Sequence, residues 1–533
     1  MTSHLTRPDR VSAYALLAGA LAVVLVAAPY KQFDLDRFFV PKELVLHLTA
    51  LVAGMLCLAR AGQLRLGRTD ELLALFLGLG LLSALFATNW WLAGRAVAVS
   101  VSGAICFWSA RALARRGLER LLVTGLALAG VVGAATALLQ AYGLESEHFS
   151  LNRAPGGTFG NRNFMAHLCV IALPAVVLTS LLAASRKAYF AWTFGIAAIG
   201  AALVMSRSRA AWLALIAAVV VMSVLGVIAL RRGRGTIRPG RLILLPFASL
   251  LGGAAALVLP NTLNWSSDSP YADTAKGVVN YKDGSGQGRL VQYGNTLQMT
   301  LRHPLVGVGP GNWAVDYPRY AGRRDPSLST EGMTSNPWPS SDWMTFLSER
   351  GPAAFIVLGL ALLVLLVDGL RGLGTEHTVE ERLRAVTLLG TIAILLVVGT
   401  FDAVLLLPVP ALIAWSLLGA LSSPARERRV IDLPAARRVA LVALAAMVTA
   451  GGAVRSGAQL SAMAIFSSST RTTQLERAAA RDPGSYRIRT RLATGYLNRG
   501  NCTRARHHAS AARSFFPEAP QPRRILRSCG RGE

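Results

Sequence analysis

Acidic residues are scarce in this chain of 533 residues, which has 28 Asp and Glu against 55 Lys and Arg and a formal net charge of +27. Charged side chains make up only 16% of the residues, hydrophobic ones make up 53%, and the mean hydropathy is +0.44. These proportions exclude an ordinary soluble domain. The positive charge alone would suggest nucleic acid. Most arginines, however, lie between long apolar runs, so membrane topology explains them and we expect no nucleic-acid partner.

The sequence motifs that hold common cofactors are also missing. The chain has no Gly-rich phosphate loop, no nucleotide-binding fingerprint and no zinc-type cysteine spacing. We therefore expect neither a cofactor nor a metal site. The first apolar run, Val11 to Tyr30, has no small-residue cleavage site and is followed by a second run, which indicates a membrane anchor rather than a signal peptide.

Long apolar runs recur along most of the chain, and a run of about 18 or more residues can cross the bilayer as a helix. Thirteen candidates begin near Val11, Leu44, Leu72, Ala96, Leu121, Ala166, Tyr189, Ala210, Leu242, Pro352, Ala385, Leu405 and Val439. The least sharp division between runs lies around Phe401 and Asp402. The sequence predicts an all-α, polytopic membrane protein with about 13 transmembrane helices.

Basic residues alternate between the loops and set the orientation. If the N-terminus with Arg7 and Arg10 is cytoplasmic, every second loop is rich in Lys and Arg. These loops are 60–68, 111–120, 186–187, 231–241, 371–384 and 426–438. The pattern predicts a multi-pass protein of the bacterial inner membrane, with a periplasmic C-terminal tail because thirteen spans is an odd number.

Three segments then face outward: the loop Glu145 to Arg162, residues 261–351 between spans 9 and 10, and the tail 456–533. The second has eight Lys or Arg, eight Asp or Glu and many Gly, Pro and Trp residues, which favours a folded outer cap. We expect a transmembrane domain over residues 1–455, which includes this cap, followed by a separate helical-hairpin tail.

The tail has the spacing of a tetratricopeptide helix pair. The matching positions are Leu492, Tyr496, Gly500, Ala505, Ala512 and Pro517, preceded by a half-repeat at Leu475, Ala478 and Pro483. Pro483 and Pro517 are 34 residues apart, one full period. A generic Ala- and Arg-rich helical hairpin is the alternative. So short an array buries little core alone, so we expect it to pack on the cap or on a partner such as a polysaccharide-export protein.

The five cysteines divide by location. Cys57, Cys106 and Cys169 fall in apolar runs, where thiols usually serve as inert packing residues. Cys502 and Cys529 fall in the outer tail, where a disulfide can persist. We predict a Cys502–Cys529 bridge that stabilises this small module.

Three arginines stand at span ends that the charge pattern assigns to the outside. Arg207, Arg209 and Arg289 are unusual there, because outer loops are usually poor in arginine and a charge at the membrane boundary is costly unless it is paired. A phosphate-bearing lipid substrate would pair with them. The alternative is that they only mark the interface, with their side chains extended toward water.

Four short motifs lie at outer span ends or in the outer cap. They are Gly157–Phe164 (GTFGNRNF), Met205–Trp212 (MSRSRAAW), Gly288–Leu290 (GRL) and His303–Trp313 (HPLVGVGPGNW). Each is weak alone, whereas their order and their common side are specific. Glycine and asparagine in the first motif permit a tight turn where the chain re-enters the membrane.

This set resembles the O-antigen ligase and O-antigen polymerase superfamily, the membrane glycosyltransferases that use polyprenyl-linked sugars, over roughly Phe33 to Leu421. The resemblance implies a helical fold in which the large outer loop caps a cavity. It also implies that arginines bind the donor pyrophosphate while an acceptor hydroxyl attacks the anomeric carbon without metal. Arg209 and Arg289 match the donor-binding arginines of the family and are the predicted catalytic pair.

Other predicted site residues follow from the same motifs. Arg207, Arg162, Asn163 and Ser340 are predicted to bind substrate. Ser340 stands where the family has a histidine that binds or activates the acceptor, a departure that puts ligase chemistry in doubt but not donor binding.

The proton acceptor has two candidates near that departure. Asp342 fits the retained acidic position and is the predicted general base, with Glu349 as the second candidate. We expect a structural role for His303.

The function indicated is an inverting, metal-independent glycosyltransferase of O-antigen or exopolysaccharide biosynthesis. It would polymerise polyprenyl-pyrophosphate-linked glycan, or transfer it to a lipid or glycan acceptor, at the outer face of the membrane. A transporter or flippase of lipid-linked sugars is the alternative from another class. Such a protein should carry charged residues near span centres and internal repeats, and neither is evident. In a third hypothesis, the tail is a docking module and the chain has no catalytic activity.

Overall fold

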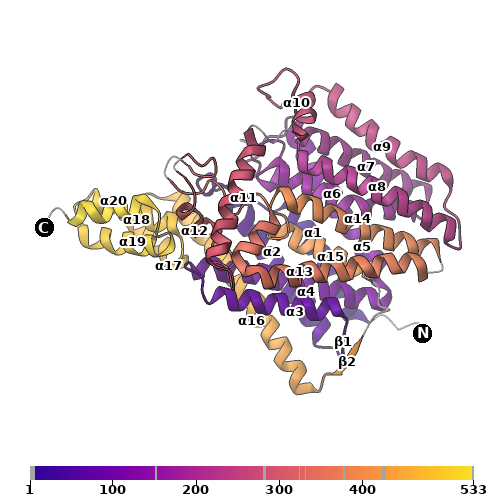
Figure 1. Ribbon diagram of the computed structural model, residues 1–533, viewed down its shortest axis with the longest axis horizontal. Helices are drawn as coiled ribbons and strands as arrows, with labels where there is room; N and C mark the ends of the chain where they lie inside the picture. Colours follow the sequence, from indigo (N-terminus) through magenta and orange to yellow (C-terminus); the bar gives the residue numbers. More distant parts are fainter. Residues whose placement is uncertain are drawn as a thin grey trace.

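The structure is a computed structural model that describes residues 6–150, 153–279, 284–322, 324–329, 332–375, 378–422 and 428–530. Helices make up nearly all of the regular structure in these ranges (Figure 1). Ten described segments are long and apolar enough to cross a membrane by length and composition. The prediction of a helical, multi-pass membrane protein is confirmed.

The long apolar helices follow the predicted runs. They are α1 (Arg7–Leu25), α2 (Asp36–Leu58), α4 (Trp90–Leu113), α5 (Glu119–Ala141), α6 (Arg162–Leu181), α7 (Arg186–Ser206), α8 (Arg209–Arg232), α9 (Pro239–Val258), α13 (Asp342–Thr375), α14 (Val379–Phe401) and α16 (Ala435–Ser468). A π-helical turn, η2 (Ala114–Leu118), joins α4 and α5 into one apolar segment, Trp90–Ala141.

Two predicted spans correspond to shorter helices, α3 (Arg68–Ala84) with 17 residues and α15 (Pro408–Leu421) with 14 residues. Both fall short of the roughly 18 residues that cross a bilayer, so the count of thirteen spans stays a prediction.

The short helix α15 is the most enclosed element of the bundle. All of its residues are buried, and it packs against α2, α4, α5, α6 and α14. A helix that is apolar all round belongs inside a protein. At about 1.5 Å per residue, α15 is shorter than the hydrocarbon core. If it is a span as predicted, the adjoining residues 402–407 complete the crossing. Their backbone groups therefore need partners within the protein.

The predicted cytoplasmic loops meet at one end of the bundle. Strand β1 (Gln63–Leu66) pairs antiparallel with β2 (Arg429–Asp432), although more than 360 residues separate them along the chain. Arg384 on α14 forms an ion pair of 2.9 Å with Glu119 on α5. Both pairs join loops that the charge pattern assigns to the same side. Arg426, in the last basic loop, lies outside the described residues.

The predicted outer segments meet at the opposite end. Arg37 donates hydrogen bonds to the carbonyl oxygens of Glu147 and Phe149, at 3.0 and 2.7 Å. Ser83, at the end of α3, donates to the carbonyl oxygens of Val306 and Glu349, at 2.6 and 2.7 Å. The loops thus sort into two groups as expected. Which end faces the cytoplasm stays a prediction.

The segment between α9 and α13 folds on the outer end. It contains α10 (Pro270–Lys276), η4 (Gly277–Val279), α11 (Gly284–Arg302), α12 (Trp313–Asp316) and η5 (Tyr317–Arg319). Met299, Val308, Trp313, Ala314 and Tyr317 form a small apolar core of their own. This segment, which we call the cap, is therefore a folded unit.

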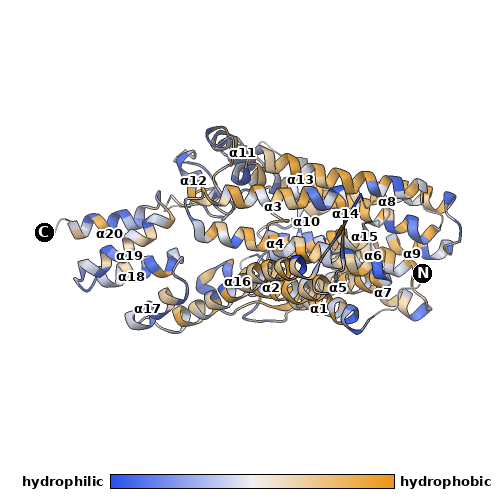
Figure 2. Cartoon of the chain, turned by 90° about the horizontal axis from the view of Figure 1, so that it is seen from below, coloured by the Kyte–Doolittle hydropathy of each residue, from blue (hydrophilic) through white to orange (hydrophobic). Residues whose placement is uncertain are grey.

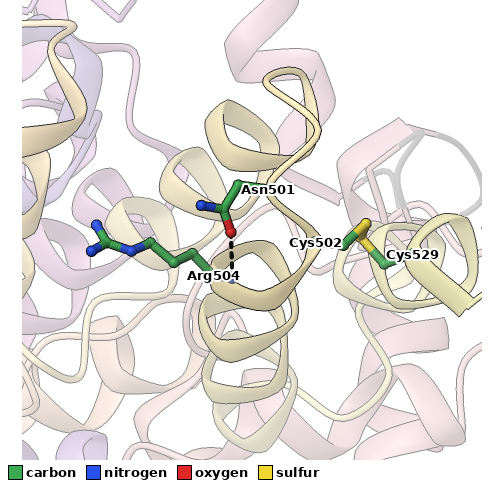
Figure 3. Close-up of a disulfide and its surroundings, with 4 residues drawn as sticks. All are labelled: Asn501, Cys502, Arg504 and Cys529. Atoms are coloured by element: carbon green, nitrogen blue, oxygen red, sulfur yellow. Dashed lines mark hydrogen bonds between the residues drawn. A yellow bond between two sulfur atoms is a disulfide. The ribbon is translucent and has the colours of Figure 1, made fainter.

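The tail begins where α16 extends past the bundle. It contains α17 (Thr472–Arg481), α18 (Tyr486–Leu497), α19 (Cys502–Phe515) and α20 (Pro520–Gly530), and hydrophilic residues are frequent in it (Figure 2). A disulfide joins Cys502 to Cys529, as expected, and thereby ties the start of α19 to the end of α20 (Figure 3).

The tail packs on both the cap and the transmembrane domain. Glu518 forms an ion pair of 3.2 Å with Arg319 of the cap. Asn89, at the start of α4, donates to the carbonyl oxygen of Phe515 at 3.3 Å. Phe33 packs edge-on against Phe466 of α16, with ring centroids 5.0 Å apart. These contacts agree with the expectation that so short a helical array packs on the rest of the chain.

The orientation can be tested with topology reporters. Alkaline phosphatase is active only outside the cytoplasm, so a fusion at Glu533 should be active and a fusion in the loop Arg231 to Arg241 should be inactive. A cytoplasmic reporter such as a fluorescent protein should show the opposite pattern at both sites. An active phosphatase in the loop, or an inactive one at Glu533, would reverse the predicted orientation or change the span count.

A buried polar network in the tail holds His508 in its neutral form. His508 is only 2% exposed, and its Nδ1 lies 3.2 Å from Nη1 of Arg489. Arginine can only donate, so Nδ1 accepts, and Nε2 donates to Glu476 at 3.0 Å. This arrangement requires a neutral imidazole. Burial accordingly lowers the pKa of His508 more than the Glu476 carboxylate raises it.

We therefore expect acid to loosen the tail. The folded tail resists protonation of His508 while the unfolded tail takes up a proton at the ordinary value of 6.5. Stability is then present above that pH and is lost as pH falls below it. Hydrogen exchange of α17–α19 in the full chain, corrected for intrinsic rates, should show faster opening at pH 5.5 than at pH 7.5. His508→Gln should flatten this dependence, and His507→Gln, next to it, should not. A tail whose opening does not change with pH would contradict the assignment.

Candidate functional site

The turn between α7 and α8 brings two of the predicted arginines to the outer end. Arg207 has a left-handed backbone with φ of 53°, which is uncommon for a residue other than glycine. Its Nε donates to Oγ1 of Thr274 in α10 at 2.8 Å, and Arg209 begins α8 two residues later. Both arginines therefore reach the segment that leads into the cap.

Two guanidinium groups contact the indole ring of Trp265. Arg162, the first residue of α6, lies 4.9 Å from the centroid of the indole ring, and Arg207 lies 4.6 Å from it. Each contact is a cation–π interaction. The two like charges contact one ring and repel one another, so an anion bound beside both would be stabilised. Asn163 follows in the first turn of α6, where its backbone N–H donates to Oδ1 of Asn161 at 3.0 Å.

Arg209 reaches helix α11, which carries Arg289. Its guanidinium donates to the carbonyl oxygen of Gly277 and, at 2.6 Å, to Oγ of Ser285. Arg289 comes four residues after Ser285 and so lies on the same face of α11, one turn further on. Arg209 of α8 thus contacts α11 one turn before Arg289, although the two arginines are 80 residues apart in sequence.

Several polar atoms of residues at this end have no partner among the described residues. Nε of Arg289, Nε1 of Trp265 and both ring nitrogens of His167 are buried without a hydrogen bond. An unpaired buried polar group costs about 1–3 kcal/mol. Arg289 and Asp402 are the charged groups that act on His167, which is 1% exposed. A cluster of such atoms beside arginines is typical of a site that binds a polar ligand.

Ser340 packs on the same helix. Its backbone N–H donates to Oε1 of Gln292 at 2.7 Å, and its carbonyl accepts from the hydroxyl of Tyr293 at 2.6 Å. Gln292 and Tyr293 follow Arg289 by three and four residues, which is one turn of α11. Ser340, which stands where the family has its histidine, therefore contacts α11 one turn after Arg289.

The carboxylate of Asp342 already accepts two backbone hydrogen bonds and therefore fits poorly as a general base. Its Oδ1 and Oδ2 accept the N–H groups of Val404 and Leu405, both at 2.9 Å, and its side chain is completely buried. We interpret Asp342 as the hydrogen-bond acceptor for the backbone N–H groups of the irregular segment before α15. The second candidate, Glu349, is engaged in a similar way, because it accepts the N–H groups of Gly311 and Trp313 at 2.7 and 3.1 Å.

Two other residues complete the survey of the site. His303 lies with Nε2 3.4 Å from the hydroxyl of Tyr320 inside the cap, in agreement with a structural role. Among the described residues, no group of three or more His, Cys, Asp or Glu side chains is arranged to hold a metal ion.

Trp265, His167 and Asp402 were not predicted as site residues. Trp265 is one of many aromatic residues in the outer segment. His167 is a lone histidine in an apolar run, which usually indicates packing. Only its spacing from Asn163, four residues and thus one helical turn, could have suggested that it faces the same site.

The fold and the site together define a class: a helical membrane protein with a capped, arginine-rich site at one end of its spans. Residues 194–359 match the family model described as O-antigen ligase. No curated protein matches the chain. The matched stretch contains Arg207, Arg209, Arg289, Ser340 and Asp342.

The match supports the resemblance to the O-antigen ligase superfamily and indicates a membrane enzyme that processes lipid-linked glycans. It ends within α13 and does not reach the tail, whose tetratricopeptide character stays a prediction.

The role of Asp342 can be separated from catalysis by one substitution. In Asp342→Asn, the new amide NH2 must face a backbone N–H where an oxygen now accepts, so the variant should lose about 1–3 kcal/mol of stability. Thermal unfolding in detergent should show a lower Tm. Asp402→Asn should change the Tm less, because among the described residues its carboxylate accepts one backbone N–H, that of the adjacent Ala403. An Asp342→Asn protein that melts like the wild type but has lost turnover would restore the general-base hypothesis.

Proposed function

We propose that this protein is an inverting, metal-independent glycosyltransferase that acts on a polyprenyl-pyrophosphate-linked glycan at the outer face of the inner membrane. In the reaction, an acceptor hydroxyl oxygen attacks the anomeric carbon and forms the new glycosidic bond. The bond from that carbon to the pyrophosphate breaks, and its electron pair leaves with the polyprenyl pyrophosphate. The acceptor is the hydroxyl of a second glycan or of a lipid.

The observation that carries the proposal is the contact of Arg209 with Ser285, which lies one turn before Arg289 on the same face of α11. A pyrophosphate leaving group gains negative charge in the transition state, and fixed guanidinium groups stabilise that charge. Arginine suits this task because its planar fork binds two phosphate oxygens at once and keeps its charge. Arg162 and Arg207, stacked on Trp265, supply further positive charge at the same end.

The hydroxyl proton needs an acceptor, and the geometry around Asp342 and Glu349 disfavours both carboxylates. We assign this role to His167, because both of its ring nitrogens lack partners among the described residues and it is close enough to Arg289 to feel its charge. In this proposal, His167 on α6 takes the part that the histidine at the position of Ser340 has in the family.

The flippase alternative is less well supported. A flippase exposes its charged groups to both sides in turn. The arginines that contact Trp265 and α11 lie at one end only, and the folded cap covers that end alone.

The decisive variants are Arg209→Lys and Arg289→Lys. Each keeps the charge and loses the two-point grip, so each should lower turnover by about 100-fold or more. The assay follows elongation or acceptor transfer of a polyprenyl-pyrophosphate oligosaccharide by purified protein. The double variant should be little worse than either single one, because groups that act on one leaving group work as a unit. His167→Gln should lower kcat with donor affinity unchanged.

Arg231→Lys, at the opposite end of α8, is the matched control and should keep full activity. Normal glycan transfer by both lysine variants would favour the hypothesis that the arginines only anchor the interface. Movement of intact donor across vesicle membranes without any transfer product would favour the flippase.

A further inference from the structure

A second basic site lies at the opposite end of the bundle from Arg209 and Arg289. A cavity of about 550 Å³ opens between the start of α3, the end of α4 and the second half of α13. Its lining residues are Gly67, Arg68, Thr69, Arg111, Leu360, Leu363, Val364, Val367, Asp368, Arg371 and Arg428. The volume is in the range of small-molecule binding sites.

One wall of the cavity changes from apolar to charged along a single helix. Leu360, Leu363, Val364 and Val367 recur on α13 at spacings of three and four residues, so they share one face. The charged residues Asp368 and Arg371 continue the same face toward the loop. Leu360 and Leu363 are 43% and 51% exposed, so this wall is open on the side where lipid lies.

The other wall supplies positive charge. Arg68, Arg111 and Arg428 join Arg371 around the mouth, against the single carboxylate of Asp368. Arg111 is only 5% exposed and pairs with Asp70 at 2.8 Å through Nη1, but its Nε is buried without a partner. The first turn of α3 adds the buried Thr69 at a helix N-terminus, where backbone N–H groups favour anions.

A neighbouring cavity shows that this charge is particular to the site. A pocket of about 180 Å³ at the same end is lined by Arg120 and Arg384, but also by Glu119 and Glu380. Its charges balance, and Arg384 already pairs with both glutamates at 2.9 and 2.7 Å. Location among basic loops therefore does not by itself produce an excess of arginine at a cavity.

We propose that the larger cavity binds an anionic phospholipid from the membrane leaflet on the side of the N-terminus, which is predicted to be cytoplasmic. The phosphate lies among Arg68, Arg371 and Arg428, and an acyl chain follows the apolar stripe of α13. Basic pockets between transmembrane helices on the cytoplasmic side bind anionic headgroups in this way. Phosphatidylglycerol has the net negative charge that four arginines against one carboxylate favour. This site does not depend on the glycosyltransferase proposal.

The test is native mass spectrometry of the full chain in detergent, with phosphatidylglycerol or phosphatidylethanolamine of the same acyl chains as the probe. The wild type should retain phosphatidylglycerol selectively. Each lost arginine near the headgroup should weaken binding about fivefold, so Arg68→Gln with Arg371→Gln should weaken it by about 25-fold. Arg186→Gln, an exposed arginine at the same end that does not line the cavity, should bind as the wild type does.

Three outcomes would overturn the proposal: equal retention of the two lipids, unchanged affinity in the double variant, or selective retention of a polyprenyl phosphate instead of the phospholipid. If the double variant does not elute as a folded monodisperse species, Arg371→Gln alone decides. This side chain is exposed, and its loss should still give about fivefold weaker binding.

Discussion

Two buried carboxylates at the start of α13 connect the cap to the transmembrane domain, and the outer site depends on them. Asp342 accepts two backbone N–H groups from the segment before α15, and Glu349 accepts two from the segment that follows α11. The two residues are seven positions apart and therefore share one face of the helix. Buried charge is tolerated only when such partners surround it, so each carboxylate fixes the loop that it contacts.

The position of Arg289 follows from this arrangement. Helix α11 leads directly into the segment that Glu349 holds, and Gln292 and Tyr293 on the same helix contact Ser340, two residues before Asp342. A shift of either carboxylate would displace α11 and, with it, the contact between Arg209 and Ser285. The glycines of the HPLVGVGPGNW motif have a related purpose. Gly307 has φ of 69° and lies so close to the backbone of Ser348 and Glu349 that a Cβ atom would clash.

The apolar runs and the alternation of basic loops were enough to predict the long helices and the two groups of loops, because hydropathy and charge act locally along the chain. The status of α15 could not be predicted in the same way. Lipid and protein core are both apolar, so a helix surrounded by other helices has the same composition as one that faces lipid. Its short length and full burial depend on the neighbours α4 and α5, which the sequence of α15 does not encode.

In the site, too, features that depend on neighbouring residues in the sequence could be predicted, and contacts between distant residues could not. The arginines were predictable because a charge at an outer span end is conspicuous by itself. The contacts of Asp342 were not, since an acidic residue in a motif can serve as a base or as a backbone acceptor, and the sequence does not show that Val404 and Leu405 lie beside it. Trp265 gains its meaning from Arg162 and Arg207, which approach it from two other helices.

Arginine at the outer end is informative because the charge rule does not predict it there. At the other end the rule predicts arginine in any case, so its presence alone does not indicate a binding site. The contacts of Arg209 with Gly277 and Ser285 direct it into the cap rather than along the membrane surface, which weighs against a purely interfacial anchor. At the end predicted to be cytoplasmic, the charge rule would explain any arginine equally well. There, only the geometry distinguishes Arg384, held between two glutamates, from Arg68 and Arg371 at the mouth of a cavity with a single acidic group. In our proposals, the same residue type sets orientation in one place and recognises a phosphate in another, and the local balance of charge separates the two roles.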